Sequence, residues 1–234
     1  RYRRASGLPL GRAGRPGRPN THAKRSLGRT PARPPLGQAG SAPAYHVAER
    51  AGMGRVRTLA SQTGLGGMPD VPSLALGTGE VTLLDLSAAY AVFPNLGRVR
   101  PATVIRSVRR DAEALGAERG ESRRVASEPA SYVVSHLLEG VVEHGTGGEV
   151  RRLGLTAPLA GKTGTTDRER DAWFVGYSRD FVVGVWVGFD DGRPIGLSAA
   201  RAAIPVWVPI MRHVLAAYGA QPFRVPEGVV FREV

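Results

Sequence analysis

The sequence contains no cysteine, and no stretch of it approaches the ~20 consecutive apolar residues that span a bilayer. The first absence excludes a disulfide framework and any metal site built on thiolates. Arg, Gly and Pro interrupt every short apolar run near the N-terminus, so we expect no export signal in this chain. With 42% hydrophobic residues, the 234-residue chain still has enough apolar side chains for a substantial core.

Acidic residues are missing from residues 1–44, which hold nine Arg and one Lys. This segment carries most of the formal net charge of +12, so residues 45–234 are close to neutral. Its seven Pro and seven Gly, and the absence of a helical or strand period, predict a disordered basic segment. Three explanations stay open: a solvated tail, an arm that binds nucleic acid or an anionic surface, and a stretch translated from an unintended reading frame.

Residues 45–234 show helical periodicity first and strand periodicity later. Two strands separated only by Ser178–Asp180 predict an antiparallel hairpin. The fold class is therefore α+β, an antiparallel sheet flanked by helices. The predicted helices are Tyr45–Arg50, Val56–Ser61, Leu83–Phe93 with Thr82 as N-cap, a helix opened by Pro129 that ends at Gly145, and Ala202–Tyr218. The predicted strands are Thr103–Val108, Ala157–Thr165, Ala172–Tyr177 and Phe181–Phe189.

Two of these helices have apolar side chains at helical spacing. In the last one, Pro205 and Pro209 indicate that the regular part starts late. The helix after Pro129 is expected to place Val133, Leu137, Val141 and Val142 on one face, and the last helix to turn Val206, Ile210, Val214 and Leu215 towards the core.

The segment Gly161–Thr166 carries the side chains suited to chemistry. Lys162 provides a fixed positive charge, and Thr163 and Thr165 project from the same face of a strand, where their hydroxyls can grip one carboxylate. Gly164 allows another backbone to approach closely. The backbone N–H of Thr165 is a natural oxyanion donor, and an exposed edge here would accept a substrate peptide as an added strand. Four such residues alone are weak evidence, because they recur by chance in ordinary strands.

A longer resemblance surrounds this motif. The segments that carry it are Pro72–Thr82, Leu83–Tyr90, Phe93–Gly97, Leu159–Thr166, Asp171–Tyr177, Val185–Asp190, Ala203–Val208 and Val225–Val229. Through them, residues 45–234 resemble the C-terminal part of the transpeptidase domain of class A, bifunctional penicillin-binding proteins, in the superfamily of serine D,D-peptidases and β-lactamases.

That resemblance implies an acyl-enzyme mechanism on the D-Ala-D-Ala stem peptides of peptidoglycan, with β-lactams as suicide substrates. It implies that Lys162 supports proton transfer, that Thr163 and Thr165 bind the substrate carboxylate beside Gly164, and that the Thr165 N–H forms half of the oxyanion hole. It also implies a parent protein on the periplasmic side of the inner membrane, whose membrane anchor is not in this chain. No cofactor, metal or nucleic-acid partner is expected.

The family also needs a Ser-x-x-Lys and a Ser-x-Asn, and the sequence contains neither. Its two lysines, Lys24 and Lys162, follow Thr21 and Leu159 by three residues. Ala39 and Ser41 stand where the Ser and Asn of the second motif belong. We hypothesise that a frameshift, sequencing error or gene decay replaced the upstream catalytic region, and we expect the chain to be inactive. A D,D-carboxypeptidase or β-lactamase, and a binding protein with a basic tail, are the alternatives.

Other residue types have simpler explanations. The five His are scattered without metal spacing, and Asp190–Asp191 is expected to be a turn at a strand end. Trp173, Trp186 and Trp207 are expected in the core and sheet. A solvated basic face is expected from Arg106, Arg109, Arg110, Arg123 and Arg124.

Overall fold

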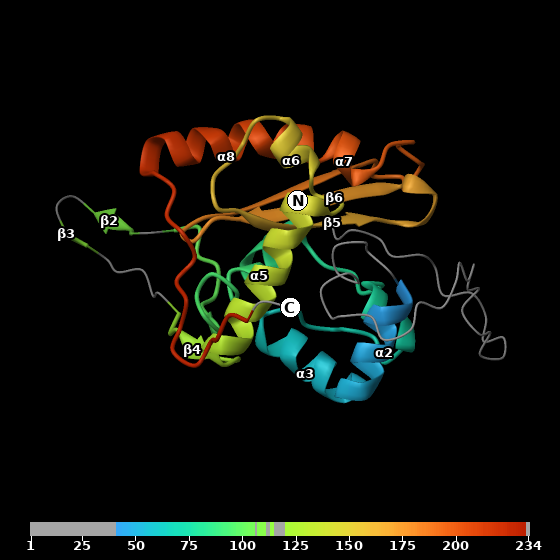
Figure 1. Cartoon of the computed structure of the whole chain (residues 1–234), viewed down its shortest axis with the longest axis horizontal. Helices are drawn as coiled ribbons and strands as arrows, with labels where there is room; N and C mark the ends of the chain where they lie inside the picture. The colour runs from blue at the N-terminus through green and yellow to red at the C-terminus, as the bar shows by residue number, and fades with distance from the viewer. Residues whose placement is uncertain (1–40, 106, 111–112, 115–119, 233–234) are drawn as a thin grey trace.

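A three-stranded antiparallel sheet organises the chain. The computed structural model describes residues 41–105, 107–110, 113–114 and 120–232 (Figure 1). The strand order is β5–β6–β7, with β5 at Ala160–Thr165, β6 at Asp171–Tyr177 and β7 at Val182–Gly188. The predicted hairpin is β6–β7, which pairs Tyr177 with Val182. The α+β class with an antiparallel sheet is therefore confirmed.

Helices cover both faces of this sheet. Helices α6 (Glu149–Arg152), α7 (Ala199–Ala202) and α8 (Ile204–Tyr218) lie on one face, and α4 (Leu83–Tyr90) and α5 (Glu128–His144) lie on the other (Figure 1). Successive side chains of a strand point to opposite faces, so β6 supplies both cores. Phe174 meets Trp207 of α8 edge to face, with ring centroids 5.0 Å apart. Tyr177 points the other way and stacks on Phe93.

The core face of α8 differs from the prediction. The buried residues are Ile204, Trp207, Val208, Met211 and Leu215, at helical spacing, whereas Val206 and Ile210 are exposed. The helix also starts at Ile204 rather than late, because Pro205 occupies its first turn, where a missing N–H is tolerated. The chain has two apolar stripes here, and spacing alone does not choose between them.

The predicted start of α4 and the predicted end of α5 are confirmed, whereas α4 ends at Tyr90 and not at Phe93. Thr82 caps α4, since its hydroxyl accepts from the Asp85 N–H at 3.0 Å. Ser127 caps α5 by accepting from the Ala130 N–H at 3.3 Å, and the helix ends at the C-cap Gly145. The expected face of α5 is wrong in part, since Val133 is exposed. The buried side of α5 consists of Ser131, Tyr132, Ser135, Leu138, Val141 and Val142.

The first described helices pack less tightly than the rest. Helix α2 (Ser41–Ala51) is followed by α3 (Met53–Gln62) and by the short 3-10 helix η1 (Pro72–Leu76), and neither α3 nor η1 contains a buried residue. Because α2 begins at Ser41, residues 41–44 are helical rather than part of a disordered segment. The rest of that prediction, for residues 1–40, lies outside the described residues.

The region between Arg98 and Arg124 departs most from the prediction. Thr103–Val108 forms no strand in its described residues, and Val104 and Ile105 are exposed there. Short strands lie on either side instead: β1 (Arg98–Val99) pairs with β4 (Arg123–Arg124), and β2 (Arg109–Arg110) pairs with β3 (Glu113–Ala114). An apolar segment without a partner strand has no ladder to complete, so it stays irregular.

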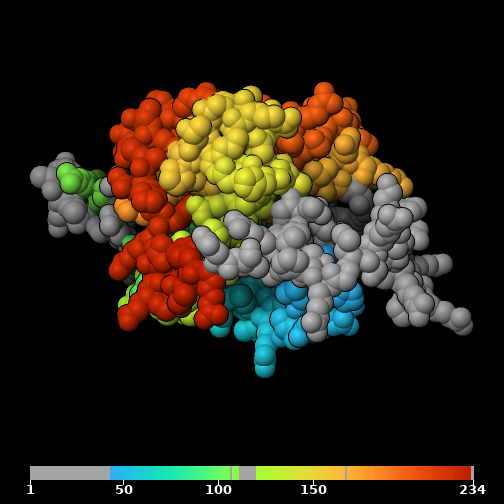
Figure 2. Space-filling model, in the orientation of Figure 1, coloured from blue at the N-terminus to red at the C-terminus, as the bar shows by residue number. Residues whose placement is uncertain are grey.

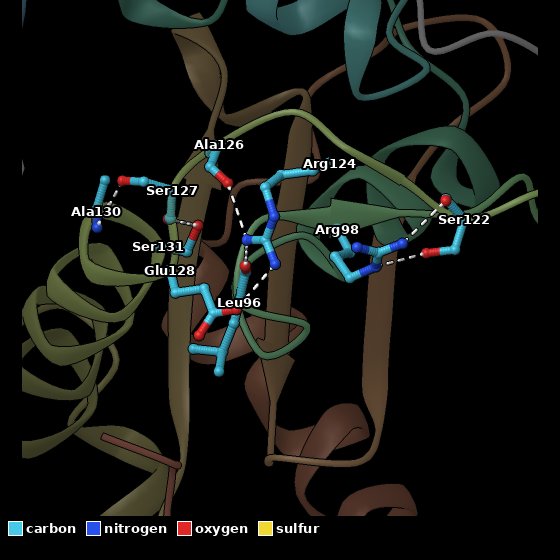
Figure 3. Close-up of polar contacts among 9 residues, drawn as sticks. All are labelled: Leu96, Arg98, Ser122, Arg124, Ala126, Ser127, Glu128, Ala130 and Ser131. Carbon is cyan, nitrogen blue, oxygen red and sulfur yellow. Dashed lines mark hydrogen bonds and ion pairs between the residues drawn. The ribbon is translucent and has the colours of Figure 1, made fainter. Parts of the chain in front are cut away.

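Two arginines of the expected solvated face, Arg123 and Arg124, are exposed and also donate to backbone carbonyls. Arg124 donates to the carbonyl of Leu96 at 2.9 Å and forms an ion pair with Glu128 at 2.8 Å (Figure 3). Arg123 donates to the carbonyl of Gln62 at 2.6 Å. These contacts join the β1–β4 pair to the start of α5 and to the end of α3. Of the other predicted members, Arg109 and Arg110 are exposed and Arg106 lies outside the described residues.

The chain after α8 returns to α5. Phe223 contacts Tyr177, with ring centroids 5.7 Å apart, and Phe231 meets Tyr132 edge to face. Figure 2 shows this segment, in red, running down the surface away from α8. Among the described residues, no helix has the length and apolar character needed to cross a membrane.

Candidate active site

Strand β5 carries all four predicted site residues, Lys162, Thr163, Gly164 and Thr165. It is an edge strand of the three-stranded sheet, as far as the described residues extend. One ladder contact fixes which backbone groups face outwards: the Thr166 N–H donates to the Asp171 carbonyl at 3.2 Å. Paired residues alternate between bonded and non-bonded positions in an antiparallel ladder, so Thr163 and Thr165 direct their N–H and C=O groups away from β6. These groups face the open edge.

The Lys162 side chain reaches the same open edge. Its Nζ donates to the outward-facing carbonyl of Thr163 at 2.9 Å. The side chain is half-buried, and burial lowers the pKa of Lys162 from its usual value. Among the described residues, Lys162 forms no salt bridge with a carboxylate. A partly desolvated cation without a counter-charge favours the binding of an anion.

The two threonine hydroxyls have different partners. Thr165 Oγ1 accepts from the N–H of Ala199, at the start of α7, at 3.2 Å. This leaves the Thr165 hydroxyl proton free to be donated elsewhere. Thr163 Oγ1 lies 2.7 Å from Oγ1 of Thr146, in the turn between α5 and α6. The sequence did not single out Thr146, because only the packing of α5 on β5 brings residues 17 apart together.

The closest approach between β5 and β6 at a glycine of this segment lies at Gly161. A Cβ at Gly161 would stand 2.8 Å from the Phe174 ring and 3.1 Å from the Gly176 Cα, whereas one at Gly164 would meet Trp173 Cβ at 3.3 Å. Gly161 pairs with Gly176 at a non-bonded position, where paired Cα atoms are nearest. The glycine that the sheet requires is therefore one residue before the motif lysine.

A buried acidic residue anchors the far end of the motif. Asp171 accepts hydrogen bonds from Trp186 Nε1 at 2.9 Å and from the Thr166 hydroxyl at 3.2 Å. Its own N–H donates to the Thr166 hydroxyl at 2.9 Å. This network fastens the end of β5, next to Thr165, to the middle and outer strands. The signal in the sequence is an aspartate that opens an otherwise apolar strand.

Other candidates lie away from this edge. Asp190 and Asp191 line a surface hollow with Phe189 and Arg193, where the Arg193 guanidinium lies 3.8 Å from the Phe189 ring centre. Trp207 is fully buried, and Trp173 and Trp186 are half-buried sheet residues, as expected. Among the described residues, no three His, Asp or Glu cluster as metal ligands would. Of the second-motif positions, Ser41 begins α2 and Ala39 lies outside the described residues.

Comparisons with known proteins agree on one family. Residues 38–208 match the family described as the penicillin binding protein transpeptidase domain. Penicillin-binding protein 1A of Aquifex aeolicus is 36% identical over 212 residues, which are 89% of this chain and 29% of that protein. The protein of the same name from Neisseria gonorrhoeae is 38% identical over 171 residues, or 70% of this chain and 21% of its length. The chain thus spans less than a third of these relatives.

Solved structures show the same fold at lower identity. Penicillin-binding protein 1A from Haemophilus influenzae superposes with a TM-score of 0.77 at 22% identity, over 85% of this chain and 36% of that one. Penicillin-binding protein 3 from Mycobacterium tuberculosis, solved with aztreonam, has a TM-score of 0.64 at 22% identity, over 81% of this chain and 52% of that one.

The sequence matches begin upstream of residue 45. The family match begins at residue 38. The Aquifex alignment covers 89% of the 234-residue chain, so the part outside it is shorter than the 44 residues of the basic segment. Some of that segment therefore aligns with the relative. The resemblance therefore extends further upstream than the sequence motifs indicate.

Proposed function

Because the chain belongs to the penicillin-binding protein transpeptidase family, we propose that its β5 edge is the substrate-carboxylate side of a D,D-transpeptidase site. The proposed ligands are peptidoglycan stem peptides ending in D-Ala-D-Ala, and β-lactams that resemble them. The observation that carries the proposal is the half-buried Lys162, which has no described carboxylate partner and whose Nζ donates to the outward carbonyl of Thr163 at the open edge.

Each residue of the β5 edge would have its own role in binding the substrate. Lys162 supplies the positive charge, and the hydroxyls of Thr163 and Thr165 donate to the terminal carboxylate of the peptide. The outward N–H of Thr165 donates to the oxygen of the scissile carbonyl, as one half of an oxyanion hole. The other outward backbone groups, the Thr163 N–H and the Thr165 carbonyl, hold the peptide as an added strand. Gly164 adds no side chain to the face of β5 that Lys162 occupies.

We further propose that these 234 residues bind substrate without completing the reaction. Acyl-enzyme formation needs a hydroxyl nucleophile and a base that takes its proton. The sequence has no Ser-x-x-Lys and no Ser-x-Asn, and Lys162 cannot serve as both nucleophile and base. The relatives span more than three times the aligned length, so cross-linking of peptidoglycan in the periplasm is proposed for a longer parent protein.

Two measurements test this function. We expect no covalent band after incubation with a fluorescent penicillin and denaturing electrophoresis, and a band would overturn the proposed inactivity. We expect reversible binding of N-acetyl-D-Ala-D-Ala, followed by NMR shifts of the Gly164 and Thr165 amides. Lys162→Ala should weaken this binding about tenfold or more, since a hydrogen bond to a charged group contributes ~1.5–3 kcal/mol.

A matched control separates a local charge from net charge. Arg179→Ala removes one positive charge at the β6–β7 turn, where Arg179 pairs with Asp180 at 3.2 Å. It should leave the affinity unchanged. Equal losses in Lys162→Ala and Arg179→Ala would mean that the peptide binds by general electrostatic attraction and not at the β5 edge.

A further inference from the structure

Thr146 brings a third hydroxyl to the β5 edge. It lies in the Gly145–Gly148 turn after α5, and its Oγ1 is 2.7 Å from Thr163 Oγ1. The turn is held against the end of the helix, because the N–H groups of Gly145 and Gly147 both donate to the Val141 carbonyl, at 3.1 and 3.0 Å. Gly147 is needed there, since a Cβ would stand 3.1 Å from that same carbonyl oxygen. Thr146 is itself exposed, so its hydroxyl is accessible from solvent.

The number of hydroxyl protons determines how many hydrogen bonds Thr146 and Thr163 can donate to a ligand. Each hydroxyl has one proton, and a bond at 2.7 Å uses one of the two. The pair therefore presents one free O–H, whichever residue donates internally. Thr165 presents another, because its oxygen already accepts from the Ala199 N–H. Two free donors on one face of β5 match the two oxygens of a carboxylate.

We propose that Thr146 is a positioning residue for the carboxylate site, which orients the Thr163 hydroxyl and shares its donor role. This inference rests on the proposed function of the β5 edge. Without the Thr146 hydroxyl, the Thr163 hydroxyl rotates freely and must be ordered when the ligand binds. With it, the proton available to the ligand is directed before binding.

The test measures the affinity of the whole chain for N-acetyl-D-Ala-D-Ala by NMR titration, with the C-terminal amide of the same peptide as a control ligand. Thr146→Val and Thr146→Ala should each lower the affinity about threefold to tenfold, the range expected for one hydrogen bond. Thr146→Ser should restore it. In a Thr163→Val background, Thr146→Val should have a much smaller effect, because the two hydroxyls act as a pair.

The outcomes separate this inference from the function on which it rests. If Lys162→Ala weakens binding but both hydroxyl-free Thr146 variants bind like the unaltered chain, the role of Thr146 is wrong and the carboxylate site stands. If Thr146→Ser fails to restore the affinity, Thr146 acts only through the packing of the turn, and the proposal is also wrong. If the unaltered chain binds the acid no better than the amide, the proposed function fails and the role of Thr146 fails with it.

Discussion

Asp171 and Trp186 join the middle strand of the sheet to its outer strand through a hydrogen bond of 2.9 Å from the indole Nε1 to the carboxylate. The same carboxylate accepts from the Thr166 hydroxyl of the β5 end. The side chain of Asp171, which is 9% exposed, thus accepts from a donor on β7 and from one at the end of β5. Such a buried acceptor is hard to replace, because each donor left unpaired keeps its full desolvation cost.

We therefore predict that Asp171→Asn lowers the free energy of unfolding by about 1–3 kcal/mol. An amide has one acceptor oxygen, so its NH₂ group would face either the Trp186 N–H, whose bond would be lost, or the Thr166 hydroxyl, whose bond to a charged acceptor would become a weaker neutral one. Urea denaturation followed by tryptophan fluorescence measures the change. Asp180→Asn, at an exposed ion pair with Arg179, is the control and should change stability very little. Equal midpoints for the two variants would contradict the network.

A pair of glycines tests the close approach of β5 and β6. Gly161→Ala should destabilise the fold by roughly 1–3 kcal/mol, because its Cβ would lie 2.8 Å from the Phe174 ring and 3.1 Å from the Val175 carbonyl oxygen. Gly140→Ala should stabilise it by about 0.5–1 kcal/mol, since Gly140 lies inside α5 and nothing stands within 4 Å of its Cβ position. Thermal unfolding followed by circular dichroism compares both. A stable Gly161→Ala variant would mean that the two strands are further apart.

The two faces of α8 give the next prediction. Trp207 is fully buried and donates from Nε1 to the Val183 carbonyl at 2.8 Å, so Trp207→Ala should cost about 3–5 kcal/mol. The adjacent Val206 is 47% exposed, and Val206→Ala should change stability by no more than about 0.5 kcal/mol. Chemical denaturation of the two variants distinguishes the observed face from the one that sequence spacing indicated. A larger loss for Val206→Ala would reverse the assignment.

Local signals in the sequence were sufficient where a short segment determines its own structure. The cap at Thr82 and the turn at Ser178–Asp180 depend on residues within a few positions, and the start of α4, the hairpin and the end of α5 followed from such signals. The buried face of α8 did not follow from local signals, because the helix has two rows of apolar side chains. Only the contact of Trp207 with Phe174 determines which row is buried.

The candidate site shows the same division. Strand β5 and its threonine hydroxyls were expected from six consecutive residues, but Thr146 and Asp171 enter through contacts that the fold makes. A strand at Thr103–Val108 was expected from alternation alone. It is absent from the described residues because alternation does not provide a neighbouring strand.

The pKa of Lys162 makes a final prediction about pH. Burial lowers this pKa below 10.5, so the folded chain binds fewer protons than the unfolded chain in the alkaline range below that value. The stability cost of the buried charge is therefore present at neutral pH and is relieved as pH rises through that range. Lys162→Met should raise the melting temperature at pH 7, and the difference from the unaltered chain should shrink as the pH approaches 10.5.

Ligand binding should respond to pH in the opposite direction. A carboxylate is attracted only by the protonated lysine, so the affinity for N-acetyl-D-Ala-D-Ala should stay constant at neutral pH and fall as the pH rises through the lowered pKa of Lys162. Lys162→Arg keeps its charge throughout this range and should bind with little pH dependence, even if the different shape of its head group weakens the affinity. Titrations at several alkaline pH values compare the two proteins. Parallel pH profiles would place the responsible charge on another group, and the carboxylate would then not be bound by Lys162.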